Sequence, residues 1–291
     1  MHPAPSVIIF TIFSGLGFGL FFLLGLGFFL TNYWLNFLLF FLAYGFSIIG
    51  LLSSLFHLGN PQRFLKAFSQ WRTSWLSREG IFSTSTLIIM VPFAIGKIFL
   101  DKEFVILGVV GSALSILTIF CTAMIYAQLR TVPRWNSFFT PVLFLLYSLG
   151  GGAFLVNEGR LAAFILILSS LIQLYAWLNG DQLFKQAGSN VKSATGLGYI
   201  GEVRLLEGPH TGTNYLLKEM VYIVGRKHRI RLRIIGFILA GILPGFVLLL
   251  FNLNIFLLIL VFLIHLIGMS LIRWLFFAEA ELVVGLSLIH I

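Results

Sequence analysis

The sequence predicts an all-α integral membrane protein, a bundle of eight transmembrane helices. Of its 291 residues, 59% are apolar and only 10% are charged, whereas an average soluble domain carries about 25% charged residues. So few charges cannot cover the surface of a 32.6 kDa globule, and the mean hydropathy of +1.01 agrees. These values exclude a soluble enzyme and leave the lipid bilayer as the surrounding solvent.

The charged residues divide the chain into long apolar stretches. A helix that crosses the hydrocarbon core needs about 20 apolar residues. The stretches without Asp, Glu, Lys or Arg are 1–62, 80–96, 104–129, 135–157, 161–180 and 234–272. The four middle stretches each supply one span, and the first and last are long enough for two. The polar residues that divide these two are Thr31, Asn32, Asn36, Asn252 and Asn254.

The eight expected spans are all apolar around the whole helix. They lie near 7–30, 36–56, 81–100, 104–128, 140–156, 161–179, 234–251 and 255–273. The absence of strand-like alternation excludes a transmembrane β-barrel. Because Met1–Pro5 lacks the basic n-region of a signal peptide, the first span is expected to stay uncleaved. The Gly-x-Gly repeats between Gly15 and Gly27 follow no strand, so they predict close helix packing.

Basic residues are distributed unequally between the two ends of the spans. Eight spans place both termini on one side, with the loops 57–80 and 129–139 and the segment 180–233. That side holds 16 of the 19 Lys and Arg residues. By the positive-inside rule, both termini and these loops are expected in the cytoplasm. The net charge of +9 then reflects topology and contact with membrane lipid, and it requires no nucleic acid.

Two titratable residues lie at one expected depth. His57 ends the second span before Gly59 and Pro61, and Glu79 opens the third. Each has an ordinary explanation: an interfacial histidine, and an acid that pairs with Arg78 or complements a helix N-terminus. Together they place a base and an acid beside an apolar slot, which is what a quinone headgroup requires. On the same side, Trp135-Asn136 offers a ring and an amide, although a proline-bounded interfacial turn explains this segment equally well.

The chain offers few ligands for a metal. Cys121 is the single cysteine, whereas an iron–sulfur cluster needs about four thiolates. His57 and His265 fall in spans at unequal depths, so they do not suit a bis-histidine haem. We therefore expect neither haem nor an iron–sulfur cluster in this chain, with Cys121 and His265 as packed residues.

Several polar segments carry a family resemblance. They are His57-Leu58-Gly59-x-Pro61, Leu76-Ser77-x-Glu79, and Thr131-Val132-Pro133-x-Trp135 with Thr140-Pro141. In combination they resemble the membrane-anchor subunits of the dimethyl sulfoxide reductase family of molybdenum enzymes. Three further segments, 1–6, 69–72 and 208–211, are similar to the anchor of the quinone-dependent sulfite dehydrogenase branch. The resemblance covers nearly the whole chain except 286–291, which is unlike the family's ending.

The resemblance implies a single membrane-anchor domain over 1–291, with a cytoplasmic loop at 180–233, in a bacterial inner membrane. Such an anchor passes electrons between an iron–sulfur subunit and ubiquinone or menaquinone, while a separate molybdopterin subunit performs the catalysis. It implies a quinone site at His57 and Glu79, for which Arg78, Trp135 and Asn136 are weaker candidates. The basic residues expected to dock the iron–sulfur subunit are Arg63, Arg72, Arg226, Lys227 and Arg229.

Two rival functions remain open from the sequence. A secondary transporter or ion channel also suits eight spans, but it predicts acidic or broken-helix sites near the midplane. The acids in or beside the expected spans all lie near span ends, which counts against it. A scaffold without a quinone site is the second rival. Within the 180–233 segment, an interfacial amphipathic helix with a basic cap explains the pattern as well as a docking face does.

Overall fold

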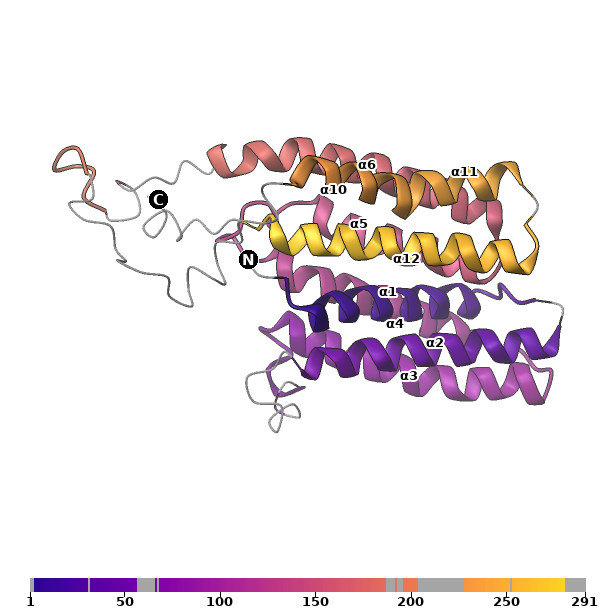
Figure 1. Ribbon diagram of the computed structural model, residues 1–291. Helices are drawn as coiled ribbons and strands as arrows, with labels where there is room; N and C mark the ends of the chain where they lie inside the picture. The colour runs from indigo at the N-terminus through magenta and orange to yellow at the C-terminus, as the bar shows by residue number, and fades with distance from the viewer. Residues whose placement is uncertain are drawn as a thin grey trace.

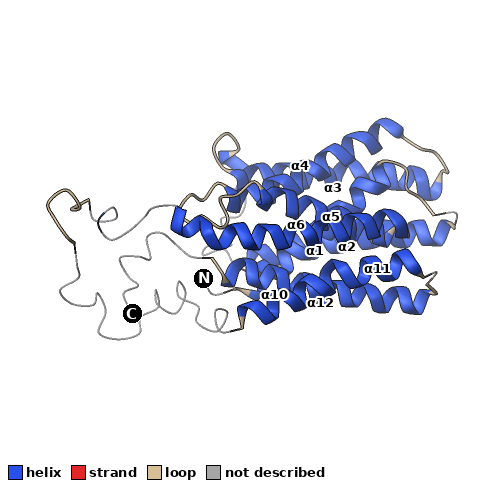
Figure 2. Ribbon diagram, turned by 90° about the horizontal axis from the view of Figure 1, so that it is seen from above, coloured by secondary structure: helices blue, strands red, loops and turns tan. Residues whose placement is uncertain are grey.

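The computed structural model describes residues 3–30, 32–56, 66, 68–186, 192, 196–203, 228–251 and 253–280. Over these residues all eight expected spans are helical, and no strand occurs (Figure 2). The helices are α1 (Pro5–Gly25), α2 (Tyr33–Leu55), α3 (Trp75–Phe99), α4 (Val105–Ala127), α5 (Phe139–Leu155), α6 (Gly159–Gln186), a rod made of α10 (Arg229–Phe237), the π-helical turn η2 (Ile238–Ile242) and α11 (Leu243–Leu250), and α12 (Ile255–Ala278).

Seven helices of the described chain are long and apolar enough to cross a membrane, the α10–η2–α11 rod counting as one. The remaining one, α5, is apolar but only 17 residues long. A length of 17 residues corresponds to about 26 Å of helix, slightly less than the hydrocarbon thickness of about 30 Å. The predicted helical membrane bundle is therefore confirmed.

The first helix lies at the centre of the bundle. In Figure 1, α1–α4 occupy one half of the bundle, and α5, α6, α10, α11 and α12 occupy the other. α1 packs against α2 and α4 on one side and against α5 and α12 on the other. Large side chains of α1 are correspondingly buried, including Phe18, Leu20, Phe21 and Leu24.

Glycines allow this central helix to approach its neighbours closely. A Cβ atom on Gly152 of α5 would lie 2.6 Å from the backbone carbonyl of Gly19 on α1. On the α2 side, a Cβ atom on Gly50 would lie 2.4 Å from the backbone nitrogen of Ser14, if the backbone stayed in place. No side chain larger than hydrogen fits at such spacings. Cβ atoms on Gly15, Gly17, Gly19 and Gly25 would likewise lie within 2.6 Å of atoms on neighbouring helices, which confirms the predicted packing role of these four. Gly27 meets no atom within 4 Å, so the prediction is wrong for this residue.

Local capping makes some helices begin or end at residues that differ from the span limits expected from the charged residues. α1 stops at Gly25 rather than near residue 30, because Gly27 adopts a positive φ of 89°. The N–H of Phe28 then bonds to the carbonyl of Leu23 and that of Gly27 to Leu24, which is a Schellman ending. α3 begins at Trp75 rather than near residue 81, because Ser74 caps it by accepting from the N–H of Ser77.

Three helices also continue into segments that the sequence assigned to loops. α6 runs on to Gln186, and α10 begins at Arg229, so the expected loop at 180–233 is too wide at both ends. α12 continues to Ala278. A helix continues as long as its backbone N–H and C=O groups form hydrogen bonds. It tolerates charged side chains where they are paired, so a charged residue does not by itself mark the end of a helix. As a result, Asp181 and Arg233 lie on helices of the bundle, and Arg273, at the end of the expected last span, lies inside α12.

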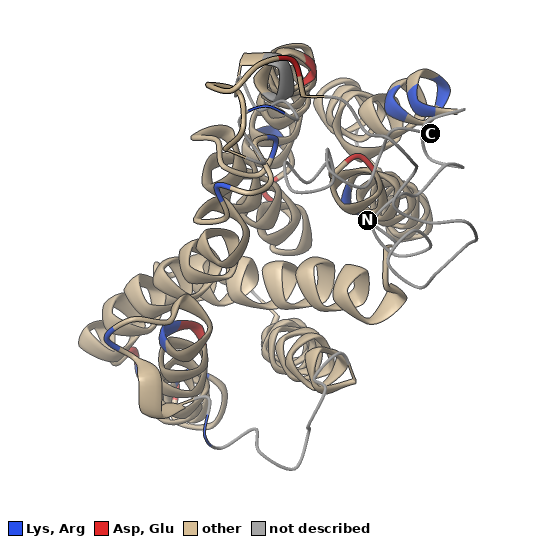
Figure 3. Ribbon diagram, turned by 90° about the vertical axis from the view of Figure 1, so that its left-hand side faces the viewer, with Lys and Arg blue, Asp and Glu red and all other residues tan. Residues whose placement is uncertain are grey.

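Chain direction brings the polar segments to one end of the bundle. α1, α3 and α5 begin at this end, and α6 and α12 end there (Figure 1). We call this the terminal end. Figure 3 faces it and shows Lys and Arg distributed over several helices. The short connection at residues 128–138 lies there too, as expected from the even number of spans.

Candidate functional site

Glu79 is a buried acid one turn inside α3. Its side chain is only 3% exposed, and the Thr122 hydroxyl on α4 donates a hydrogen bond to its Oε1 atom. The same hydroxyl lies 3.0 Å from the backbone carbonyl of Thr118. A hydroxyl has one proton and two lone pairs. It can therefore donate to an ionised Glu79, or donate to Thr118 and accept from a protonated Glu79.

The charged neighbour of Glu79 in sequence is engaged elsewhere. Arg78 donates from Nε to the carbonyl of Trp71 at 2.9 Å and from Nη2 to that of Arg72 at 2.6 Å. Its guanidinium also stacks 4.3 Å above the Trp75 ring. Arg78 thus holds the turn before α3, and no residue that the structure describes forms an ion pair with Glu79.

Several of the expected site residues lie outside the described residues: His57, Arg63, Arg226 and Lys227. Of their surroundings, only the adjoining helices are placed. α2 ends at Leu55 at the terminal end, where α3 begins. The proposed pairing of His57 with Glu79 stays a prediction.

Trp135 and Asn136 use their donors to hold the 128–138 connection in place. The indole N–H of Trp135 donates to the carbonyl of Phe276 at 2.8 Å, and the two rings stack 5.3 Å apart. Trp135 is only 4% exposed. The Asn136 amide donates to the carbonyl of Ala127 at 2.5 Å. These bonds fasten the connection to α4 and α12, which accounts for both residues in structural terms.

Tyr126 packs the end of α4 against the second half of the bundle. Its ring contacts Trp135, Phe144, Phe276 and Phe277. The centre of the Phe144 ring in turn lies 3.5 Å from the guanidinium carbon of Arg273 on α12. Neither Tyr126 nor Arg273 stood out in the sequence, because an aromatic residue in an apolar span and a basic residue at a span end are both ordinary.

A network of ion pairs joins three helices and the 128–138 connection. Arg233 on α10 donates to both oxygens of Asp181 on α6, at 2.8 and 2.9 Å. It donates equally to both oxygens of Glu279, at 2.7 Å each. Arg134 donates to Asp181 at 2.7 Å, and Arg229 lies 3.6 Å from the same carboxylate. Arg229, expected to dock a partner, is thus 40% exposed and already paired, whereas Arg72 is exposed.

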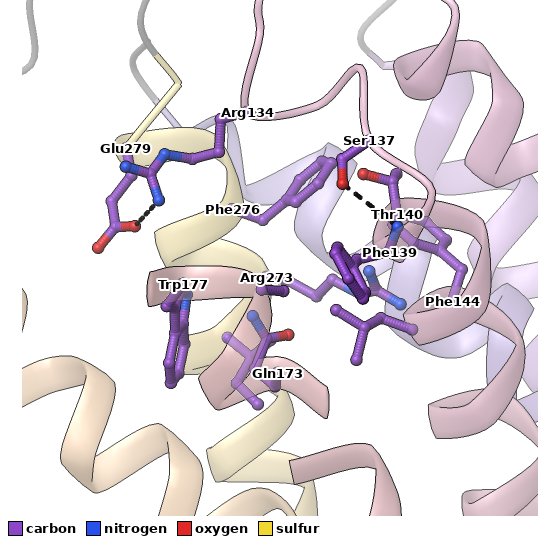
Figure 4. A pocket seen from close by; sticks show the side chains of 13 residues that line it. Arg134, Ser137, Phe139, Thr140, Phe144, Gln173, Trp177, Arg273, Phe276 and Glu279 are labelled. Atoms are coloured by element: carbon purple, nitrogen blue, oxygen red, sulfur yellow. Dashed lines mark hydrogen bonds and ion pairs between the residues drawn. The ribbon is translucent and has the colours of Figure 1, made fainter. Parts of the chain in front are cut away.

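Below this network a pocket opens between α5, α6 and α12 (Figure 4). Its empty space, including the mouth, is about 530 Å³. Phe139, Phe144, Trp177 and Phe276 give it aromatic walls, and Gln173 and Arg273 bring polar groups into it. Glu79, Trp135 and Asn136 do not line it.

His265 packs between helices as expected. Its Nδ1 atom lies 2.6 Å from the carbonyl of Ala240, in the π-helical turn Ile238–Ile242. The carbonyl of Ala240 cannot accept the α-helical bond from four residues on, because Pro244 has no N–H, and the His265 ring lies against this carbonyl. No group of three or more His, Cys, Asp or Glu residues suited to a metal occurs in the part of the chain that the structure covers. Whether the protein carries haem or an iron–sulfur cluster stays a prediction.

Comparison with known proteins assigns the chain to a family over almost its whole length. The model of the DMSO reductase anchor subunit (DmsC) matches residues 1–278. One relative, a sulfite dehydrogenase subunit of Allochromatium vinosum, is 31% identical over 327 aligned positions, which cover 97% of each protein. No solved structure matches the chain significantly.

Proposed function

This chain belongs to the family of DMSO reductase anchor subunits, and from this premise we propose that it exchanges electrons with membrane quinone on behalf of a bound oxidoreductase. It is a membrane anchor subunit of a molybdopterin oxidoreductase. The finer assignment, to the sulfite dehydrogenase type, is supported by a relative of that name at 31% identity over 97% of the chain.

The observation that carries the quinone proposal is the environment of Glu79. An acid buried to 3% exposure without a described cationic partner is costly to maintain in a membrane helix. The Thr122 hydroxyl suits the carboxyl in either protonation state. A bound quinone would supply a carrier of two electrons and two protons. Glu79 would hold or release a proton at its carboxyl, and Thr122 would keep that carboxyl oriented.

We propose a direct role in quinone binding for one further residue and indirect roles for three others. His57 would hydrogen-bond the quinone headgroup, since it follows α2 where that helix reaches the terminal end. Trp135, Asn136 and Arg78 would act indirectly, by fixing the loops around the site through their bonds to backbone carbonyls. The quinone would be ubiquinone or menaquinone, and the redox metals would belong to the partner subunits.

The terminal end is also the proposed docking face for the iron–sulfur subunit. Exposed Arg72 and partly exposed Arg229 lie there, and Arg63, Arg226 and Lys227 adjoin the described helices that end there. A positive face of this kind would guide an acidic partner and make the association sensitive to salt. Electrons would pass between the partner's terminal cluster and quinone near Glu79, while the molybdopterin subunit binds the iron–sulfur subunit.

The test compares two electron routes in one preparation. Turnover of the molybdopterin subunit is measured with a short-chain quinone and with a soluble mediator, in complexes with and without this chain. We expect mediator turnover in both and quinone turnover only with the chain present. Quinone turnover that is equal in both, or absent from both, would favour a scaffold or a transporter and contradict the proposal.

A further inference from the structure

The pocket between α5, α6 and α12 holds a basic group that has no counter-ion among the described residues. Arg273 of α12 lines it and is only 3% exposed. No described residue forms a hydrogen bond or an ion pair with its guanidinium, and its Nε atom is buried without a partner. Its guanidinium carbon lies 3.5 Å from the centre of the Phe144 ring (Figure 4). An aromatic face offsets only part of the cost of burying a charge.

A second arginine faces the same pocket. Arg134 lines it, and its buried Nη1 atom has no hydrogen-bond partner. Glu279 lies 3.3 Å from this nitrogen, but both oxygens of Glu279 accept bonds from Arg233. Gln173, 8% exposed, adds an amide to the lining. Two guanidinium groups and an amide therefore line one pocket, and at least one N–H group of each guanidinium has no hydrogen-bond partner among the described residues.

The position of the pocket suits a lipid headgroup. Arg273 follows the start of α12 by 18 residues, which is about 27 Å along a helix. In a hydrocarbon core of about 30 Å this places the residue close to the polar boundary at the terminal end. Phe139, at the pocket wall, contacts Phe138 and Tyr175. These two are 77% and 60% exposed and offer an apolar surface where acyl chains would lie.

We propose that this pocket binds the phosphate group of an anionic phospholipid, with Arg273 and Arg134 as its ligands. Guanidinium groups match phosphate oxygens with paired, charge-assisted hydrogen bonds. The adjoining ion-pair network, which includes Arg134, carries a net charge of +1, because three arginines meet two acids there. The lipid would fasten α5, α6 and α12 together. This site is separate from the proposed quinone site and does not depend on it.

Thermal unfolding of the delipidated full chain in detergent tests the proposal. Added phosphatidylglycerol should raise the Tm by at least about 5 °C. Dioleoylglycerol lacks the phosphate and inorganic phosphate lacks the chains, so neither should reproduce the shift. A full shift with dioleoylglycerol, or with inorganic phosphate alone, would contradict a phospholipid site. So would an Arg273-dependent shift with a short-chain quinone and none with phosphatidylglycerol.

Variants separate a ligand role from a structural one. Arg273→Met should lose the phosphatidylglycerol shift, yet its lipid-free Tm should equal or exceed that of the wild type, because an unpaired buried charge is gone. Arg160→Gln, at an exposed residue at the opposite end, should keep the full shift. Should Arg273→Met not fold, Arg273→Lys should keep part of the shift, and native mass spectrometry of the wild type should detect one retained phosphatidylglycerol. A shift that persists in Arg273→Met, or a wild-type chain without retained lipid, would overturn the proposal.

Discussion

Thr122 on α4 hydrogen-bonds the buried carboxyl of Glu79 on α3, 43 residues away in the sequence. This bond joins the two helices of the α3–α4 pair at the terminal end. It gives a membrane-embedded acid one polar partner that accommodates either protonation state. The account of quinone exchange depends on this pair.

Replacement of Thr122 by valine removes the hydroxyl and keeps the shape of the side chain. We expect quinone-coupled turnover to fall about tenfold, which corresponds to about 1.4 kcal/mol in the barrier, with mediator turnover unchanged. Thr118→Val is the matched control. Its buried hydroxyl lies one turn away and, among the described residues, bonds only to the backbone carbonyl of Leu114. Equal kinetics in the two variants would show that the Thr122–Glu79 bond has no part in the reaction.

The close contact of α1 with α5 predicts a large effect of one methyl group. Gly19→Ala would drive a Cβ atom into the backbone at Ser148, so we expect a loss of about 1–3 kcal/mol in unfolding free energy. Gly45→Ala on α2 meets no atom within 4 Å and should leave stability within about 0.5 kcal/mol. Thermal unfolding of both variants in one detergent measures the difference, and equal Tm values would contradict the packing.

Arg233 is the residue that the ion-pair network depends on most. Arg233→Met leaves Arg134 near both Asp181 and Glu279, and Arg229 near Asp181 alone. Removal of one partner from a fully buried pair costs about 3–5 kcal/mol. Asp181 is 31% exposed, so we expect about 2 kcal/mol. Lys97→Met, in a pair with a 52% exposed Glu103, should cost less than about 1 kcal/mol. The same unfolding assay distinguishes the two.

Orientation in the membrane follows from the basic residues, of which 16 of 19 are assigned to the terminal end. A reporter that is active only in the periplasm, fused after residue 291, should therefore be silent, and a cytoplasmic reporter should be active. A strong periplasmic signal from the full-length fusion would reverse the topology and move the proposed docking face to the other side.

The sequence was informative about the spans because charge-free length is a direct physical requirement of the bilayer. It located all eight helices, but it misplaced ends that depend on local capping, such as those at Gly27 and Ser74. It also singled out Glu79, which the structure shows buried one turn inside α3. Its partner Thr122 could not be predicted from the sequence, because nothing about a threonine in an apolar helix indicates which neighbouring helix it faces.

For the charged residues beyond the expected spans, too, the sequence did not show which residues lie together in the fold. Asp181 marked the end of an apolar stretch and Glu279 counted only as an acid near a span end, whereas the structure brings them together through Arg233, 52 and 46 residues away along the chain. Arg273 was counted only as a basic residue on the cytoplasmic side. Its burial and lack of a described partner depend on how α5, α6 and α12 pack, which helix periodicity does not determine.

The most direct test of the central claim is the turnover of a complex that carries Glu79→Gln. Glutamine keeps the size and the hydrogen bond but cannot exchange a proton. Glu103→Gln, an exposed residue at the opposite end, is the control. We expect Glu79→Gln to assemble, to retain mediator turnover and to lose quinone turnover by at least about 100-fold, while the control retains both. Normal quinone kinetics in Glu79→Gln would contradict the account.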